Sequence, residues 1–273
     1  MFLGVYSLKG YPCFDKMFGN STLYEKNIRF LHRIGTSTKA GKRQVVMSSF
    51  GCTMSASTTP RMLLEDGKTM FIPRPYANFR PFTNTHKEFN SNLDLRKLVL
   101  FIEEWCLRYL IDRREHEEWA NKAFFDAMQV YELVPRSCRI YDTIFTYMSI
   151  NGDLKGSTMG IGKHIDQDDM FDFVLHIGDD GDDGATLYFE SKESNKIVTR
   201  VQFVNGKCQF GNFGKVYHGT EEWKSNRCSI TLATKTTVLN FFREYGKKPF
   251  NDCVVRNRFL CPHVVVDGYK KIN

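Results

Sequence analysis

The chain has 273 residues and a formal net charge of +7, a length that accommodates one large domain with a substantial core. Its residues are 42% hydrophobic, 14% aromatic and 25% charged, which excludes a chain dominated by disorder. No apolar run approaches the roughly 18 residues of a membrane-spanning helix. The N-terminus has no basic, signal-like start, so we expect no membrane partner and a cytoplasmic or nuclear protein.

Residues 1–90 are rich in Ser, Thr, Gly, Pro and aromatic residues, with short β-like runs such as RQVVMSSFG. We therefore expect a β-rich N-terminal extension, and we treat it as a candidate substrate-binding part. Basic and aromatic residues alternate in YEKNIRFLHRIGTSTKAGKRQ and in IPRPYANFRPF. Nucleobases stack on aromatic rings while Arg and Lys neutralise phosphates. The second stretch predicts four substrate-binding residues: Arg74, Tyr76, Phe79 and Arg80. The alternative is a loop with exposed charges and core aromatics.

Two helices are predicted in the middle of the chain. From residue 92 onward apolar residues recur at helical spacing, with Asn92 or Asp94 as the N-cap. A second helix is predicted over 117–133, ending before Pro135. Helices with one apolar face need a surface to cover, and a β-sheet is the natural one.

From residue 139 the pattern changes to short strands separated by Gly, Asn, Asp and Ser clusters. The predicted strands are RIYDTIFTYMSI, MFDFVLHIGDD, GATLYFES, IVTRVQFV, KCQFGNFGKVYHG and RCSITLATKTTVLNFF. Strands at this spacing favour a β-barrel or sandwich, so the fold class is α+β. Residues 91–273 then form the helices and the core, and the tail from 246 adds a strand or crosses back over the core.

A histidine and an aspartate lie two residues apart in the segment KHIDQDD. On an extended segment His164 and Asp166 point the same way, because side-chain direction has a period of two. His218 follows 54 residues later and is predicted to approach from a facing strand. Two imidazoles and one carboxylate on one face are the ligand set of non-haem Fe(II), with open positions for a 2-oxo acid and O₂. The alternative is a polar turn.

A polar stripe is predicted on the strand RCSITL, where Arg227, Ser229 and Thr231 share one face. The planar guanidinium of Arg227 matches the distal carboxylate of a 2-oxo acid. The alternative is a half-exposed strand with its polar residues toward water.

Taken together, the runs HID, DDGATLYFE, GNFGKVYHGT and NRCSITLATK resemble the Fe(II)/2-oxoglutarate-dependent dioxygenase superfamily. The resemblance covers about residues 139–245 and implies a double-stranded β-helix (jelly-roll) core flanked by helices. It implies Fe(II), 2-oxoglutarate and O₂ as cofactors, with ascorbate as a candidate reductant. It assigns the iron to His164, Asp166 and His218, and the 2-oxoglutarate to Arg227, Ser229 and Tyr147. Asp168 is a further substrate-binding candidate.

The resemblance leaves several substrates open. Nine acidic residues and one lysine give 160–190 a charge of −8, so the rest of the chain carries +15. A basic body suits an anionic partner, and nucleic acid is the predicted one. The leading expectation is hydroxylation of a nucleobase, on the methyl group of thymine or 5-methylcytosine or on an N-alkyl group. Ala233 stands where the AlkB type of this superfamily has a second arginine, and this difference counts against that type. A protein side-chain (prolyl or lysyl) hydroxylase, a small-metabolite oxygenase and an inactive jelly-roll binding module are the alternatives.

Overall fold

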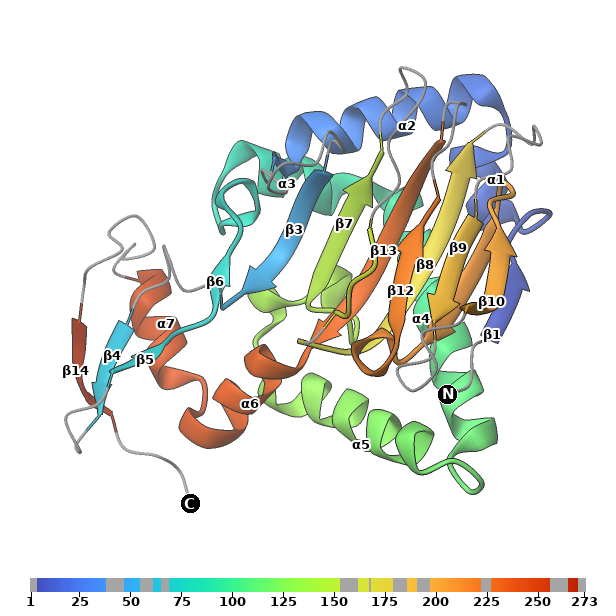
Figure 1. The fold of residues 1–273 in the computed structure, drawn as a ribbon. Helices are drawn as coiled ribbons and strands as arrows, with labels where there is room; N and C mark the ends of the chain where they lie inside the picture. The colour runs from blue at the N-terminus through green and yellow to red at the C-terminus, as the bar shows by residue number, and fades with distance from the viewer. Residues whose placement is uncertain are drawn as a thin grey trace.

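A large antiparallel sheet forms the centre of the protein (Figure 1). Helices cover one of its faces and a small three-stranded sheet lies over the other. The computed structural model describes residues 4–37, 47–54, 61–64, 69–152, 162–166, 168–178, 186–190, 197–221, 227–255 and 265–269. The predicted α+β class is therefore confirmed as a mixed fold of helices and antiparallel sheet.

The large sheet has the strand order β1-β11-β8-β13-β7-β3-β2, with β6 paired to the edge of β3. The strands span β1 (Gly4–Ser7), β2 (Thr36–Ser37), β3 (Met47–Thr53), β6 (Arg74–Pro75), β7 (Tyr147–Asn151), β8 (Asp169–Gly178), β11 (Lys207–Gly211) and β13 (Arg227–Lys235). Its longest pairing joins β8 to β13, with Ser229 opposite His176 and Thr231 opposite Val174. Strands β1 and β3 belong to this sheet, so the N-terminal residues complete the core.

The small sheet consists of β10 (Ile197–Gln202), β9 (Thr186–Glu190) and β12 (Tyr217–Thr220), in that order. Its apolar side chains pack with Val174 of the large sheet and form a second core, made of Val174, Leu187, Phe189, Val201, Phe203, Phe213 and Val216. Three more strands, β4 (Arg61–Leu64), β5 (Thr69–Phe71) and β14 (Val265–Tyr269), form a separate sheet. The tail thus adds a strand, parallel to β4.

The helices are α1 (Pro12–Phe18), α2 (Ser21–Ile34), α3 (Asn84–Ser91), α4 (Leu93–Arg113), α5 (Glu118–Leu133), α6 (Thr236–Tyr245) and α7 (Lys248–Val255). Helices α4 and α5 occupy the two predicted ranges, and Asn92 caps α4 by accepting a hydrogen bond from the Leu95 amide at 3.0 Å. Trp105 of α4 packs edge-on against Phe173 and Phe210, at 5.9 Å between ring centroids in both pairs. The prediction that α4 covers a sheet is confirmed. None of the helices in the described part of the chain has the length and apolar character needed to cross a bilayer.

Two expectations about secondary structure are wrong. The N-terminal part is not simply β-rich, because residues 12–34 form α1 and α2. Pro12 at the first position of α1 and Asn20, whose side chain accepts from the Leu23 amide, start these helices. The strand predicted over 227–242 ends at Lys235, where α6 begins. Its cap is supplied by a residue distant in sequence, since Asp168 accepts from the Thr237 amide at 2.9 Å.

Gly51 of β3 lies against the backbone that leads into β7, and we expect its replacement by alanine to destabilise the fold. Its φ of +91° is in the left-handed region, and an added Cβ would lie 2.1 Å from the Thr146 carbonyl oxygen. The backbone strain alone costs about 1–2 kcal/mol, and the clash adds to it. Gly10 has a φ of +92° with no atom within 4 Å of an added Cβ, so Gly10→Ala is the matched control. In urea unfolding, Gly51→Ala should lose clearly more free energy than Gly10→Ala, and equal losses would refute the close approach.

Candidate metal centre

Two histidines from distant parts of the chain are joined by backbone hydrogen bonds. His164 and His218 form an antiparallel bridge in which each amide donates to the other's carbonyl at 2.9 Å. Such a hydrogen-bonded pair holds the two Cα atoms about 5.5 Å apart with both side chains on one face. The imidazole centroids lie 4.3 Å apart. The prediction that His218 comes from a facing strand is refined, because it comes from the strand paired directly with His164.

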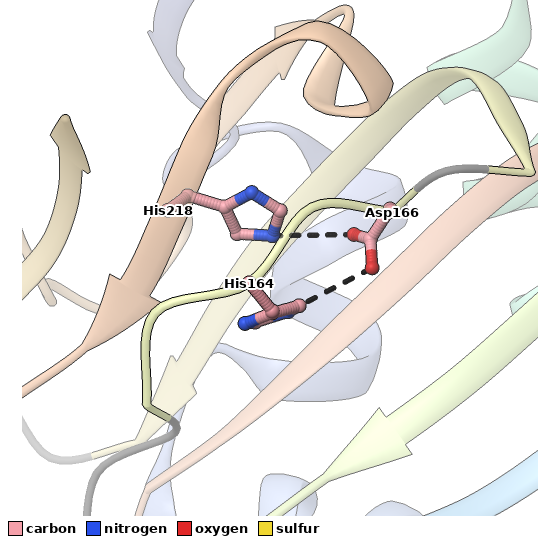
Figure 2. A group of neighbouring side chains, drawn as sticks. All are labelled: His164, Asp166 and His218. Atoms are coloured by element: carbon pink, nitrogen blue, oxygen red, sulfur yellow. Dashed lines mark ion pairs between the residues drawn. The ribbon is translucent and has the colours of Figure 1, made fainter. Parts of the chain in front are cut away.

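Asp166 completes a three-residue cluster (Figure 2). One carboxylate oxygen lies 3.2 Å from His218 Nε2, and the other lies 3.7 Å from His164 Nε2. The candidate ligand atoms all lie within 4.8 Å of one another. His218 is buried, whereas the side chains of His164 and Asp166 are 28% and 30% exposed. The cluster is therefore open to a small molecule on one side.

The outer nitrogen of each imidazole faces a backbone carbonyl. His164 Nδ1 lies 2.8 Å from the Gly162 oxygen, and His218 Nδ1 lies 3.3 Å from the Val216 oxygen. Because a carbonyl only accepts, each Nδ1 carries the proton and donates it, which leaves a lone pair on Nε2 when the ring is neutral. Two lone pairs then face the Asp166 carboxylate, an arrangement that a shared cation stabilises. Backbone carbonyls that orient imidazoles in this way are typical of metal-binding histidines.

The charge of Asp166 is favoured by its neighbours. Burial by itself would raise the pKa of this carboxyl, but when the imidazoles are protonated the hydrogen bond from His218 and the charges of His218 and His164, together with that of Lys235, lower it below its ordinary value. Asp166 is consequently the anionic donor of the cluster near neutral pH.

The cluster opens into a cavity of about 280 Å³ between the large and small sheets. One wall is polar and comes from alternate residues of β7 and β13. Leu187 of the small sheet and Phe213 add apolar side chains to the lining, as does Val174, which lies beside Thr231 in the large sheet. The polar lining side chains are Tyr147, Ser149, Asn151, Thr220, Ser229, Thr231 and Lys235. This volume accommodates a small organic acid beside the three candidate ligands.

Arg227 lies at the start of β13, adjacent to this cavity. It is 4% exposed and lines a small neighbouring cavity of about 10 Å³. Thr220 and Ser229 line both cavities, so the two adjoin. One guanidinium nitrogen of Arg227 donates to the Phe203 carbonyl, which fixes the side chain. The structure therefore brings Arg227, Ser229 and the three candidate ligands into one region, with Ser229 in the main cavity and Arg227 behind it.

Tyr147 and Lys235 form the other end of the polar wall. Lys235 Nζ lies 4.5 Å from the centroid of the Tyr147 ring, a cation–π contact. The Tyr147 hydroxyl is 3.4 Å from the Ser49 hydroxyl. Sequence reasoning predicted Tyr147 but missed Lys235. The period-two pattern that aligns Arg227 with Ser229 continues to Lys235, so the signal was present.

The N-terminal substrate candidates have different environments. Tyr76 lies beside the cavity, with its ring centroid 5.9 Å from that of Tyr147. Arg74 and Arg80 are half-buried, and burial lowers the pKa of both guanidinium groups. Phe79 is 1% exposed and packs edge-on against Phe89. The prediction for Phe79 is corrected, since a ring enclosed in the core offers no face to a base.

Two further predictions concern polar residues outside the cavity. The Asp168 carboxylate accepts from both the amide and the hydroxyl of Thr237, so it acts as the cap of α6. Its contact with a substrate stays a prediction. In the basic stretch 24–44, Arg29 and Arg33 pair with Glu25 and Glu88. Lys39, Lys42 and Arg43 lie outside the described residues.

The buried imidazole of His176, close enough to Arg227 to feel its charge, should make the stability of the fold depend on pH. Burial, followed by the charges of Arg227 and Lys207, lowers the pKa of His176 to about 3, although its hydrogen bond to Gln209 opposes this. The unfolded chain therefore binds a proton below about pH 6.5 that the folded chain refuses, and stability falls as the pH is lowered. The slope from this group reaches about 1.4 kcal/mol per pH unit.

The measurement is urea unfolding between about pH 7 and about pH 5, where His176→Gln should reduce the slope of stability against pH. The solvent-exposed His116 provides the control, and His116→Gln should leave the slope unchanged. Equal slopes in the wild type and His176→Gln would show that the buried imidazole is not the group responsible.

Comparisons with known proteins give structural neighbours only. No protein-family model matches the sequence, and no curated protein matches it. One solved structure, an oxidoreductase of the 2OG-Fe(II) oxygenase family from Burkholderia pseudomallei, is 10% identical with a TM-score of 0.39, covering 85% of this chain and 84% of that one. Another, a prolyl-4-hydroxylase from Pseudomonas putida, is 12% identical with a TM-score of 0.43, covering 85% of this chain and 91% of that one.

Proposed function

We propose that this protein is an Fe(II)- and 2-oxoglutarate-dependent dioxygenase with a double-stranded β-helix core. The observation that carries the proposal is the convergence of two Nε2 lone pairs and one carboxylate beside an internal cavity. That donor set, with a face left open, is the one that non-haem Fe(II) oxygenases use. With 2-oxoglutarate and O₂, bound Fe(II) supplies oxidative decarboxylation to succinate and CO₂, coupled to hydroxylation of a substrate C–H bond.

The residues of the protein fit this group. His164 and His218 supply neutral nitrogen donors, and the backbone carbonyls of Gly162 and Val216 hold their rings in place. Asp166 supplies the negative charge that favours a divalent cation. No other group of three or more His, Cys, Asp or Glu side chains in the described part of the chain gathers its donor atoms as closely.

The cosubstrate is proposed to lie between the metal and Arg227. Ser229 and Thr220 line both the main cavity and the space beside Arg227. A dicarboxylate can therefore present one end to the metal and extend toward the guanidinium through groups that donate hydrogen bonds. The guanidinium is buried, so its ionic hydrogen bond to the distal carboxylate is stronger than one formed in water.

The apolar lining of the cavity and the aromatic residues beside it bear on the chemical class of the primary substrate. Val174, Leu187 and Phe213 give part of the cavity an apolar lining that limits the access of water. We propose a nucleobase as the hydroxylated group, because the chain outside 160–190 carries +15 and because Tyr76 and Tyr147 place aromatic rings beside the cavity. A protein side chain is the second candidate, and one assay separates the two.

The test is succinate release in the presence of Fe(II), 2-oxoglutarate and pools of single-stranded DNA, RNA or peptides. Mass spectrometry of the pools identifies a gain of one oxygen atom. A nucleic-acid substrate should also bind more weakly as salt is added, with a slope set by the number of phosphates contacted. Turnover of the peptide pool alone, with nucleic-acid binding that does not respond to salt, would move the assignment to a protein hydroxylase. Absence of succinate with every pool would reject both nucleic acid and protein as the substrate class.

A further inference from the structure

A second cavity, separate from the metal centre, lies where α3, the start of α4 and the turns before β7 meet. Its volume is about 350 Å³, and it shares no described lining residue with the metal cavity. Three arginines contribute to its walls. One aspartate is the single acidic residue among the described lining residues. The lining residues are His86, Asn90, Arg96, Arg136, Ser137, Arg139, Tyr141 and Asp142.

The positive charge of this cavity is not balanced by ion pairs. No carboxylate of the described residues lies within ion-pair distance of Arg96, Arg136 or Arg139. Burial lowers the pKa of His86, so this imidazole is neutral at neutral pH. With Asp142 counted, the lining carries a net formal charge of +2.

Arg139 is the most informative member, because it is a buried cation. It is 7% exposed, and its Nε lies buried without a hydrogen-bond partner in the described part of the chain. Its charge is met in part by the Tyr131 ring, whose centroid lies 5.5 Å from the guanidinium carbon, and by the carboxylates of Asp142 and Glu103. The Glu103 carboxylate already accepts from the Tyr131 hydroxyl and the Ile144 amide. Removing a guanidinium from water is costly unless an anion compensates it.

The backbone around Arg139 is arranged to hold it at the cavity. Tyr141 and Asp142 have φ values of 49° and 65°, in the left-handed region that non-glycine residues rarely adopt. This conformation turns the Asp142 carbonyl to accept from Arg139 Nη1 at 3.0 Å. Tyr141 is fixed in turn by stacking on Phe89 at 4.5 Å and by donating to the Phe89 carbonyl at 2.7 Å. The cavity wall is thus rigid before any ligand arrives.

We propose that this cavity is a phosphate-binding site formed by Arg96, Arg136 and Arg139. Guanidinium groups match phosphate oxygens in pairs, and three of them exceed what one carboxylate ligand can engage. Asn90 and Ser137 add neutral hydrogen-bond donors. The phosphate belongs either to a small free phosphate or to the backbone of a nucleic acid, and the chemistry of the contact is the same.

The experiment uses the full chain without iron, so its outcome does not depend on the dioxygenase activity. The urea unfolding midpoint is measured with sodium phosphate added at constant ionic strength, because a ligand that binds the folded state stabilises it. Phosphate should raise the midpoint of the wild type. Arg96→Gln and Arg136→Gln remove exposed guanidiniums. Each should raise the dissociation constant for phosphate about tenfold. Lys97→Gln, next to Arg96 but outside the cavity, should bind phosphate as the wild type does.

A second arm measures binding of a fluorescent single-stranded oligonucleotide to the same four proteins at fixed salt. Weakened binding in both arginine variants, with competition by inorganic phosphate, would identify a backbone phosphate as the ligand. Unchanged oligonucleotide binding with lost phosphate binding would identify a small free phosphate. No phosphate-dependent shift in the wild type, or a shift that both arginine variants retain in full, would overturn the proposal.

Discussion

Asp166→Ala is expected to abolish Fe(II) binding and turnover while leaving the fold intact. The carboxylate is the single anionic donor of the cluster and lies 3.2 Å from His218 Nε2, so its loss removes one of three ligands and the charge that attracts the cation. Mutating a residue that merely orients a ligand costs about 10- to 100-fold, so loss of the ligand itself should leave less than about 1% of the wild-type rate. Succinate release under saturating 2-oxoglutarate measures this.

The matched control is Glu190→Gln. Glu190 lies opposite Tyr217 in the strand register, one residue from His218, and pairs with Lys163 at 2.8 Å. This variant removes a nearby carboxylate that is not a candidate ligand, and it should retain metal binding and turnover. The urea midpoint of Asp166→Ala checks that the chain still folds. Wild-type succinate release from a folded Asp166→Ala protein would refute the assignment of the ligands.

Arg227→Ala is expected to raise the Michaelis constant for 2-oxoglutarate by about 100-fold, since it deletes an ionic hydrogen-bond donor buried beside the cavity. At saturating 2-oxoglutarate the rate should recover in part, because the iron ligands are untouched. Arg227→Lys keeps the charge but loses the planar guanidinium. Its Michaelis constant for 2-oxoglutarate should lie between those of the wild type and Arg227→Ala. The measurement is the initial rate of succinate release as a function of 2-oxoglutarate concentration.

Arg227 also donates to the Phe203 carbonyl, so its replacement can affect packing as well as binding. Metal binding separates these effects, because a folded Arg227→Ala protein should bind Fe(II) as the wild type does. An unchanged Michaelis constant in that variant would show that the distal carboxylate is held elsewhere. Lys235, the other cation of the cavity, would then be the residue to test.

Much of the core could be predicted because its signals are local. Helices α4 and α5 follow from apolar spacing and from the Asn92 cap, and β8 follows from its alternating pattern. The start of α6 could not be found in this way, since its cap comes from Asp168, far away in the sequence. Residues 12–34 were predicted wrongly because composition was given more weight than the helical spacing of Tyr24, Ile28 and Leu31.

The candidate site was predictable in its residue types more than in its geometry. The spacing of His164 and Asp166 favours a shared face, but the backbone bridge from His164 to His218 depends on strand pairing that no single segment encodes. The N-terminal substrate candidates were also predictable in residue type but not in burial. Phe79 and Phe82 stand three positions apart, yet Phe79 is 1% exposed and lies in the core while Phe82 is 83% exposed. Tertiary packing decides which aromatic residue remains available.

The central claim is that His164, Asp166 and His218 together hold one ferrous ion. Anaerobic equilibrium dialysis against Fe(II) measures it directly, on the wild type and on His164→Ala, Asp166→Ala and His218→Ala. We predict one ion per wild-type chain and a large loss of binding in each of the three variants. A wild-type chain that takes up no Fe(II), or three folded variants that bind it as tightly as the wild type, would contradict the account.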